Sequence, residues 1–498
     1  MTISPCSACN ASGFRIEERE DEMVTFLCAI VILIGGYFLY GKLAEKVFRP
    51  DQRPTPAMAH PDGVDYVPMK TWRVFLIQLL NIAGTGPIFG ALMGAVFGPV
   101  VFLWIVLGSI LGGAIHDYMS GMISVRMNGA SISEIVGKYL GRTAKQVMRV
   151  FSVVLLILVG AVFTTSPAEL LARLTPEWMN GTFWVIVILI YYLLATLLPI
   201  DKLIGKLYPI FGMVLAVMAV GIIVGLIVGG YQLPELTLVN QHPDGLPVWP
   251  FMFVTVACGA VSGFHATQSP MMARCLKQEK DGRKVFYGAM IAEGVIALVW
   301  AAAGVAFYGA TGGLQQALAE LSPSGVVYDI SVALLGVVGG AIAVVGVVVC
   351  PISSGDTAFR SARLTLADWF KIDQSRLTRR LAITLPLLAV GALLTQVNFD
   401  IVWRYFSWSN QTLAMMTLWA AAMYLARNGR KWWHSAMCAV PAAFMSGVSC
   451  TYILMAEEGF QLSEAISYPI GAAFALGCAV LFVAKAAGKK NRELRAEL

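Results

Sequence analysis

The chain has 498 residues, of which 57% are hydrophobic and 13% are charged, and its formal net charge is +6. Soluble globular domains carry about 25% charged residues, so this composition excludes an ordinary soluble domain. Apolar stretches recur from Met23 to Lys485, and each is long enough to cross the hydrocarbon core of a bilayer. We therefore predict an all-α polytopic membrane protein.

Hydropathy predicts thirteen membrane spans, preceded by a polar extracytoplasmic tail at 1–22 that contains Cys6 and Cys9. These two cysteines form a single CxxC pair, which is weak support for a disulfide or a metal site. In chain order the expected spans are 23–42, 73–96, 98–126, 147–166, 181–199, 209–229, 249–270, 284–309, 327–352, 381–396, 406–426, 434–455 and 466–485.

Lysine and arginine give an orientation. If successive loops alternate between the two sides of the membrane, one side receives 32 of the 36 basic residues and the other receives only Arg15, Arg19, Arg173 and Arg404. Cytoplasmic loops are enriched in Lys and Arg. We expect the N-terminus outside and the C-terminus in the cytoplasm, and the basic excess needs no nucleic-acid partner to explain it.

Two predicted spans contain helix-breaking residues. The stretch "NIAGTGPIFG" (81–90) interrupts the second span, and "CGAVSGFHATQSP" (258–270) interrupts the seventh. Irregular backbone at membrane depth is tolerated only where it faces protein or a water-filled cavity. In the first break Thr85 or Gly86 would cap a new half-helix that starts at Pro87. Ser269-Pro270 repeats this arrangement in the second half, with the alternative that the pair lies nearer the cytoplasm than the break itself.

The two broken spans are five spans apart, and this spacing indicates two halves of five crossings in opposite orientation. Such inverted repeats are typical of secondary transporters, with the substrate bound near the bilayer midplane between the broken helices. The expected organisation is an extra helix (23–45), repeat 1 (73–230), repeat 2 (249–426), an accessory hairpin (434–485) and a cytoplasmic tail (486–498).

Several motifs resemble the carbon starvation protein A family, and they occur in family order over residues 73–426. They are "NIAGTGPI", "GGAIHDYMSGMISVRMNGASISEIVGKYLG" (112–141), "SGFHATQSP", "ISSGDTAFRSAR" and "WSNQTLA" (408–414). The resemblance, which is to the short form of the family, implies a bacterial inner-membrane importer of small peptides or pyruvate that is used when nutrients run short. It also implies a distant relation to inverted-repeat amino-acid transporters, with a LeuT-like core.

The substrate site is expected between the two breaks. The free N–H groups of a half-helix N-terminus suit a carboxylate, small glycines allow close approach to the backbone, and His265 would donate to the substrate. Polar residues that open the span at 406–426 are candidates for an outer vestibule or an interfacial belt. The expected substrate-binding residues are Asn81, Gly84, Thr85, Gly86, Pro87, Ser262, Gly263, His265, Gln268, Asn410 and Gln411.

Ionisable residues inside spans are candidates for proton coupling. We expect Asp117 to carry the proton, with His116 and Arg126 adjusting its pKa. Glu293 is the second candidate, on the corresponding span of the other half. Asp356 is a further candidate; it is one helical turn from Arg360, and an internal salt bridge or a solvated pair in a loop is the favoured interpretation of these two residues. Structural pairing is the alternative for each of these groups.

Sodium is the rival coupling ion. In sodium symporters of the related fold, hydroxyl groups on the eighth core span bind the ion together with backbone carbonyls of the first broken span. Ser353 and Ser354 are therefore a possible ion site, because hard oxygen ligands suit a hard cation. Both hydroxyls could instead bond the preceding helical turn.

Other classes of protein find little support in the sequence. The chain has five histidines and no HExxH, GxxxxGK[ST] or GxSxG pattern, so we expect neither an enzyme nor a primary pump, and no cofactor or metal. A membrane sensor or receptor would carry a soluble output domain, whereas the longest stretch outside the spans has about 30 residues. Secondary transport of a small molecule, coupled to H⁺ or Na⁺, is the remaining class.

Overall fold

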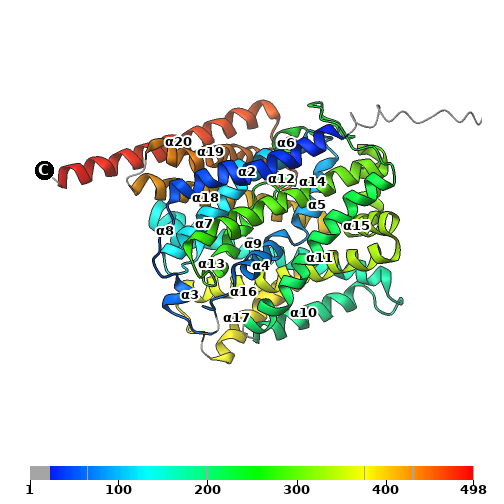
Figure 1. Cartoon of the computed structure of the whole chain (residues 1–498), viewed down its shortest axis with the longest axis horizontal. Coiled ribbons are helices and arrows are strands. Elements are labelled where there is room, and N and C mark those ends of the chain that lie inside the picture. Colours follow the sequence, from blue (N-terminus) through cyan, green and yellow to red (C-terminus); the bar gives the residue numbers. More distant parts are fainter. Residues whose placement is uncertain (1–22, 64, 198–199, 375, 429–430, 497–498) are drawn as a thin grey trace, which may run out of the picture.

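A computed structural model describes residues 23–63, 65–197, 200–374, 376–428 and 431–496 of the chain (Figure 1). These residues form helices and loops, without a strand in the described part. The predicted polar tail, with Cys6 and Cys9, lies outside the described residues. Elements of the first half are α2 (Val24–Phe48), α3 (Pro56–Ala59), α4 (Thr71–Ala83), α5 (Gly86–Ala95), α6 (Val101–Leu107), the π-helix η1 (Gly108–Gly113), α7 (Ala114–Arg126), α8 (Ile132–Leu140), α9 (Arg142–Leu174), α10 (Gly181–Leu197) and α11 (Ile200–Val228).

The second half ends in a long C-terminal helix, α20, which extends past the other helices in Figure 1. Its elements are α12 (Val248–Thr255), α13 (Phe264–Ala273), η2 (Glu279–Asp281), the π-helix η3 (Arg283–Tyr287), α14 (Gly288–Tyr308), α15 (Thr311–Val344), the π-helix η4 (Val345–Val349), α16 (Cys350–Phe370), α17 (Leu377–Leu394), α18 (Phe399–Arg427), α19 (Trp432–Met455) and α20 (Glu464–Ala496).

Each of the thirteen predicted spans coincides with helical residues. Within the described part of the chain, nine helices are long and apolar enough to cross a membrane, or ten if the bent pair α4 and α5 is one span. These numbers confirm a multi-pass helical membrane protein, while the number thirteen stays a prediction.

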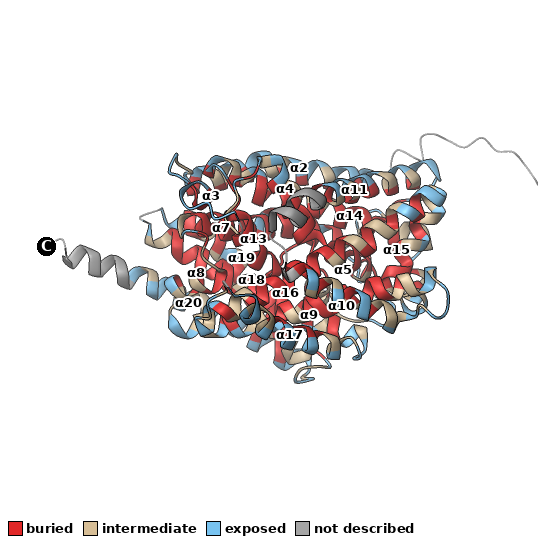
Figure 2. Ribbon diagram, turned by 90° about the horizontal axis from the view of Figure 1, so that it is seen from below, coloured by how far each residue is buried: buried red, intermediate tan, exposed pale blue. Residues whose placement is uncertain are grey.

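The helices form a buried centre and an apolar periphery. The continuous helix α6–η1–α7 is almost wholly buried, whereas α2, α17 and α20 are mostly exposed although strongly apolar. Figure 2 shows the buried residues in the middle of the bundle and the exposed ones on its outer helices. Exposed apolar helices around a buried centre that also contains polar side chains are the expected arrangement of a protein whose outer surface meets lipid.

The first break lies where the sequence predicts it. Helix α4 ends at Ala83, Gly84 adopts φ +38° and ψ −136°, and α5 begins at Gly86, bent by 45° from α4. Residues with a side chain rarely adopt this φ, so glycine permits the turn. Thr85 is the N-cap residue and Pro87 lies in the first turn of α5, which confirms the predicted start of a new half-helix.

The second break spans residues 256–263, between α12 and α13. Gly259 has φ +95°, and a Cβ atom there would lie 2.6 Å from that of Ala297. Gly263 is the N-cap of α13, and Ser269 and Pro270 lie inside this helix. The prediction that Ser269-Pro270 starts the half-helix is therefore wrong, because the proline follows the first helical turn and does not begin it.

Two other segments differ from the sequence prediction. Helix α16 continues to Phe370, so the region expected as a loop after residue 356 is helical. Helix α15 begins at Thr311, before the predicted span, and its backbone leaves helical geometry at Ser322 and Gly336. Polar and charged side chains on these extensions lower the local hydropathy, and that is why the sequence pattern missed the additional turns.

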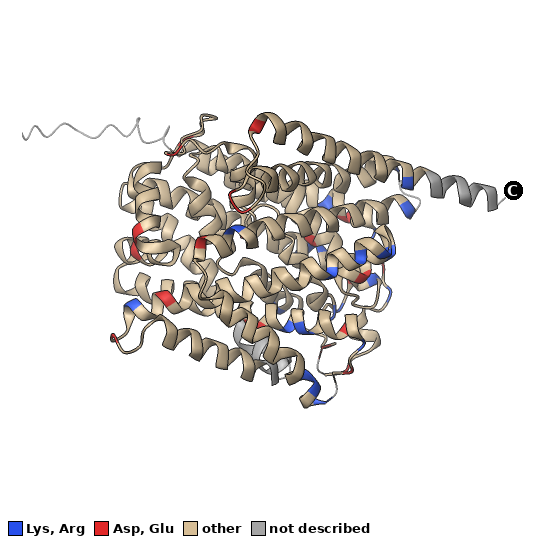
Figure 3. Ribbon diagram, turned by 180° about the vertical axis from the view of Figure 1, so that it is seen from behind, with Lys and Arg blue, Asp and Glu red and all other residues tan. Residues whose placement is uncertain are grey.

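Lysine and arginine gather at one end of the bundle. In Figure 3 most of the blue segments lie toward the end from which α20 projects, and few lie at the opposite end. This polarity matches the uneven distribution of basic residues between alternate loops.

Candidate functional site

Asp117 lies between two imidazole rings in the centre of the bundle. Its Oδ1 is 2.8 Å from Nδ1 of His116, and its Oδ2 is 2.9 Å from Nδ1 of His265. All three side chains are fully buried. An ionised carboxylate only accepts hydrogen bonds, so both Nδ1 atoms carry hydrogen when Asp117 is charged. Helix α7 and the broken-helix segment α13 are thereby joined by a polar contact at the core.

Glu293 extends this group to a third helix. Its Oε2 on α14 lies 3.4 Å from Nε2 of His265, so the two nitrogens of one ring face carboxylates from α7 and α14. Glu293 is also fully buried. We name Asp117, His116, His265 and Glu293 the acid–histidine cluster. A buried chain of carboxylate, imidazole and carboxylate can accept, hold and pass a proton.

Asn410 of α18 holds the start of α13 in place. Its Oδ1 accepts the backbone N–H of Phe264 at 2.6 Å and the hydroxyl of Ser262 at 3.1 Å, and its backbone oxygen accepts the N–H of Gly263 at 3.1 Å. The first N–H groups of a helix have no partner within the helix. At the start of α13, the neighbouring helix α18 supplies the acceptors for these N–H groups.

The start of α5 has no such cap. The N–H groups of Gly86 and Ile88 make no hydrogen bond to the described part of the chain, and the Thr85 side chain does not cap them. The hydroxyl of Thr85 and both polar atoms of the Asn81 amide are buried without a hydrogen-bond partner among the described residues. Buried polar atoms are usually paired, so this group is suited to a polar ligand.

Glycines bring the two breaks into contact. A Cβ atom on Gly86 would overlap the side chain of Cys258, and one on Gly263 would overlap the backbone oxygen of Asn410. The space next to Gly86 is thus filled by Cys258, which differs from the expectation that this glycine lets a ligand approach the backbone. Gly84 lies near Phe163 and the hydroxyl of Ser354.

Gln268 and Gln411 are buried near the second break. Gln268 donates from Nε2 to Thr267 at 2.9 Å, and Gln411 donates to the backbone oxygen of Phe253 at 2.9 Å. In both side chains the amide oxygen has no hydrogen-bond partner among the described residues. Asn410 and Gln411 are fully buried between helices. The interpretation of these two residues as an interfacial belt is therefore wrong.

Arg126 belongs to a different cluster. Its guanidinium donates to both carboxylate oxygens of the buried Glu279 at 3.2 and 3.1 Å, and to the hydroxyl of Tyr424 at 3.0 Å. Arg53 also approaches Glu279, at 3.8 Å, and its hydrogen bonds to Asp51 lower the pKa of that exposed carboxyl to about 2. The structure thus gives Arg126 an acidic partner other than Asp117.

The serines expected at an ion site have separate partners. Ser353 donates to the backbone oxygen of Cys350 at 2.7 Å, within its own helix, whereas Ser354 donates to the backbone oxygen of Leu80 on α4 at 3.1 Å. Asp356 is buried close to them on α16, and Arg360 donates to the backbone oxygen of Ala195 at 2.9 Å. Asp356 is not among the residues that contact the acid–histidine cluster.

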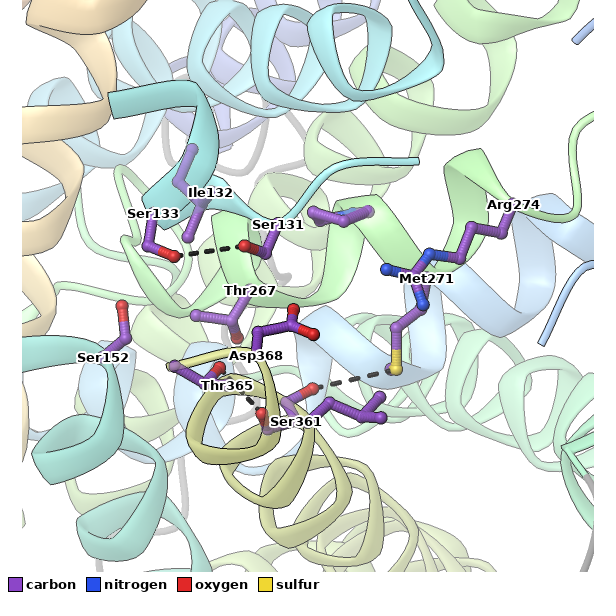
Figure 4. A pocket seen from close by; sticks show the side chains of 12 residues that line it. Ser131, Ile132, Ser133, Ser152, Thr267, Met271, Arg274, Ser361, Thr365 and Asp368 are labelled. Carbon is purple, nitrogen blue, oxygen red and sulfur yellow. Dashed lines mark hydrogen bonds between the residues drawn. The ribbon is translucent and has the colours of Figure 1, made fainter. Parts of the chain in front are cut away.

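A small cavity leads toward the second break from the end of the bundle that carries Arg274. Its volume is about 40 Å³, and it lies among α8, α9, α13 and α16. Figure 4 shows the hydroxyl groups that line it, together with Arg274 and Asp368. Thr267 belongs to this lining and is the residue that accepts from Gln268. Thr267 is the lining residue nearest in the sequence to His265.

The structure brings together residues that the sequence suggested separately. Asp117, His116, His265 and Glu293 meet in one cluster, and Asn81, Thr85 and Pro87 lie at one break. Cys258 and Glu279 were missed, because a lone cysteine in a span and an acidic residue in a predicted loop carry no pattern. The residues that lie close to them, Asn410 for Cys258 and Arg126 for Glu279, are far from them in the sequence.

Comparisons with known sequences identify relatives. A family model described as carbon starvation protein CstA matches residues 21–179 and 172–321, which is more than half of the chain. An uncharacterized membrane protein of Haemophilus influenzae is 43% identical over 353 residues, covering 60% of this chain and 95% of that protein. The peptide transporter CstA of Bacillus subtilis is 27% identical over 525 residues, covering 84% of this chain and 88% of that protein. The pyruvate/proton symporter BtsT of Escherichia coli is 30% identical over 355 residues, covering 56% of this chain and 49% of that one.

Comparisons with solved structures identify the fold. MhsT in complex with L-phenylalanine matches with a TM-score of 0.53 and 15% identity, covering 83% of this chain and 98% of that one. A mutant of the manganese transporter of Eremococcus coleocola matches with a TM-score of 0.51 and 12% identity, covering 85% of this chain and 97% of that one. Both are LeuT-fold transporters, and the likeness shows that this chain has the same fold.

Proposed function

Because the chain belongs to the carbon starvation CstA family, we propose that it is a proton-coupled secondary transporter that imports small peptides or pyruvate across the bacterial inner membrane. Relatives named as peptide transporters and as a pyruvate/proton symporter support this substrate class. Both kinds of substrate carry a carboxylate, so a site for a carboxylate is the feature to seek.

The observation that carries the proposal is the uncapped start of α5. Its first N–H groups, and the buried amide of Asn81 and hydroxyl of Thr85, lack partners among the described residues. Helix N-termini attract anions through these N–H groups and the helix dipole. The start of α13 is occupied by Asn410. We therefore assign the substrate carboxylate to α5 and not to α13.

The acid–histidine cluster is the proposed route of the coupled proton. Asp117, His265 and Glu293 come from α7, α13 and α14, so a change of charge at any one of them alters contacts among three helices. Proton uptake would relieve the attraction between the carboxylates and the imidazole ring. The segment that precedes α13 packs against the start of α5, where Cys258 fills the space beside Gly86. A protonation event is thereby linked to the helix start that is proposed to hold the substrate carboxylate.

The proposed orientation places the C-terminus in the cytoplasm. The end of the bundle rich in Lys and Arg then faces inward, in agreement with the positive-inside rule. In this orientation the cavity lined by Thr267 and Arg274 opens toward the cytoplasm. It would be the inner end of the substrate pathway.

Uptake by proteoliposomes tests the proposal. Labelled pyruvate and a labelled dipeptide are offered side by side, with pH and sodium gradients imposed independently. We expect accumulation of one of them that follows the pH gradient and collapses with an uncoupler. Asn81→Ala should raise KM about tenfold or more, which corresponds to one lost hydrogen bond to a charged group. Accumulation that persists without any ion gradient would contradict the proposal.

Sodium coupling is a second candidate that one contact favours. Ser354 on α16 donates to the carbonyl of Leu80 at the end of the broken helix α4, and a hydroxyl facing a carbonyl is a suitable pair of ligands for a hard cation. If uptake follows the sodium gradient and ignores pH, Ser354→Ala should abolish the sodium dependence. Unchanged sodium dependence in that variant would remove Ser354 from the ion site.

A further inference from the structure

We propose that Cys258, His265 and Glu293 form a binding site for a transition-metal ion of the Zn²⁺ type. The ligand atoms of these three buried residues lie within 4.8 Å of one another. They come from the second break, the first turn of α13 and the middle of α14. A thiolate, an imidazole and a carboxylate are the three ligand types that Zn²⁺ prefers.

The distances are close to those of a tetrahedral site. With metal–nitrogen and metal–oxygen bonds of about 2.1 Å, two ligand atoms of a tetrahedron lie about 3.4 Å apart. The distance from Nε2 of His265 to Oε2 of Glu293 is 3.4 Å. The sulfur of Cys258 lies within 4.8 Å of the other two ligand atoms, and a zinc–sulfur bond has a length of about 2.3 Å. The three side chains thus form an almost complete set of ligands, and a fourth position stays open.

The surroundings orient these ligands for metal binding. Asp117 lies 2.9 Å from Nδ1 of His265, on the side of the ring away from Glu293. In many metal sites a carboxylate accepts from one nitrogen of a histidine whose other nitrogen binds the metal. This arrangement fixes the orientation of the ring and raises the basicity of the ligand nitrogen. Nδ2 of Asn410 donates to the sulfur of Cys258 at 3.4 Å, and this contact helps to orient the sulfur.

The nitrogen and oxygen ligand atoms of this site have little else to bind. Nε2 of His265 and both carboxylate oxygens of Glu293 lack a well-formed hydrogen bond among the described residues, and only the 3.4 Å ion-pair contact joins them. Buried polar atoms without good hydrogen bonds call for an explanation. A metal ion would satisfy all of them at once; it would bind the neutral ring at Nε2, so metal binding and passage of a proton from His265 to Glu293 exclude one another. The expectation of a metal-free protein rested on the absence of a linear motif, and these ligands do not form one.

Cobalt binding to the purified protein tests the proposal without any transport assay. The full chain is prepared in detergent without a histidine tag, reduced, and titrated with Co²⁺ alone. We expect one Co²⁺ per chain and a thiolate-to-cobalt charge-transfer absorption in the near ultraviolet, which Zn²⁺ then displaces. If the wild-type protein shows no such absorption and no bound metal by elemental analysis, the proposal is overturned.

Three variants assign the ligands. Cys258→Ser should lose the charge-transfer absorption, and Glu293→Gln should weaken Co²⁺ binding at least tenfold. Cys438→Ser, which removes another buried thiol, should bind Co²⁺ as the wild type does. Size-exclusion profiles show whether each variant is folded. Retention of the absorption in a folded Cys258→Ser protein would overturn the assignment. The result is independent of transport, so failure of the proposed function would leave it unaffected.

Discussion

The side-chain oxygen of Asn410 accepts the backbone N–H of Phe264 at 2.6 Å, although the two residues are 146 positions apart. One helix therefore supplies the cap of another, and the second break is held by α18. The same side chain reaches Ser262 and the sulfur of Cys258. Asn410 is thus a fixed point for the whole segment between α12 and α13.

Replacing Asn410 by alanine should destabilise the protein. The N–H of Phe264 would be buried without a partner, which costs about 1–3 kcal/mol. We expect a lower Tm in a thermal-unfolding assay and weaker uptake. The control is Asn398→Ala, which removes an exposed N-cap of α18 and should cost about 1 kcal/mol. Equal losses in the two variants would argue against a special role for Asn410.

Replacing Asp117 by asparagine should separate accumulation from exchange. Asparagine keeps the shape of the side chain but cannot gain or lose a proton. We expect loss of uphill accumulation driven by a pH gradient, while exchange of labelled for unlabelled substrate continues, since exchange needs no net proton movement. Asp244→Asn, in an exposed loop, should transport normally. Uphill accumulation by Asp117→Asn would rule out Asp117 as the proton carrier.

Arg126 and Glu279 should act as a structural pair and not as a part of coupling. Arg126→Ala leaves the fully buried carboxylate of Glu279 without its main partner, and breaking a buried ion pair in this way costs about 3–5 kcal/mol. We expect a clear loss of Tm that the double variant Arg126→Ala/Glu279→Gln largely restores. The pH dependence of uptake by the double variant should match that of the wild type. A shifted pH profile would show that Arg126 does influence the proton site.

Replacing Gly86 by leucine should abolish uptake because the two breaks could no longer touch. A side chain at Gly86 would overlap Cys258, whereas Gly35 on α2 has nothing within 4 Å of its hypothetical Cβ atom. Gly35→Leu is therefore the matched control and should retain uptake and expression. Normal uptake kinetics in Gly86→Leu would show that the contact between the breaks is dispensable.

Much of the architecture follows from the sequence because its signals are local. Hydropathy identifies a multi-pass helical membrane protein, and the glycines and Pro87 place the first break within a residue or two. The second break was predicted within the right segment, but its half-helix starts at Phe264 and not at Pro270. The sequence alone does not distinguish a proline inside a helix from a proline at its start. The hydrogen-bond acceptors of the first N–H groups of the helix, which the structure provides, do distinguish them.

The candidate site follows from the sequence in part. Charged residues inside spans are costly, so Asp117 and Glu293 stood out singly. Their connection through His265 depends on three helices packing together, and no local pattern encodes that. The partners of Arg126 and Cys258 are long-range for the same reason. Asn410 was recognised as a polar residue in a motif, whereas its capping role required knowing which helix start lies beside it.

The two half-helix starts differ in what completes them. The start of α13 is closed by Asn410, so its amides should exchange slowly with deuterated water whether substrate is bound or not. The start of α5 has no partner in the described protein, so its amides depend on the ligand for protection. Substrate would then serve as the missing cap of a helix, and its arrival would be recorded as slowed hydrogen exchange at Gly86 and Ile88 alone. The starts of α5 and α13 would then differ in the source of their hydrogen-bond acceptors, which is the substrate at α5 and Asn410 at α13.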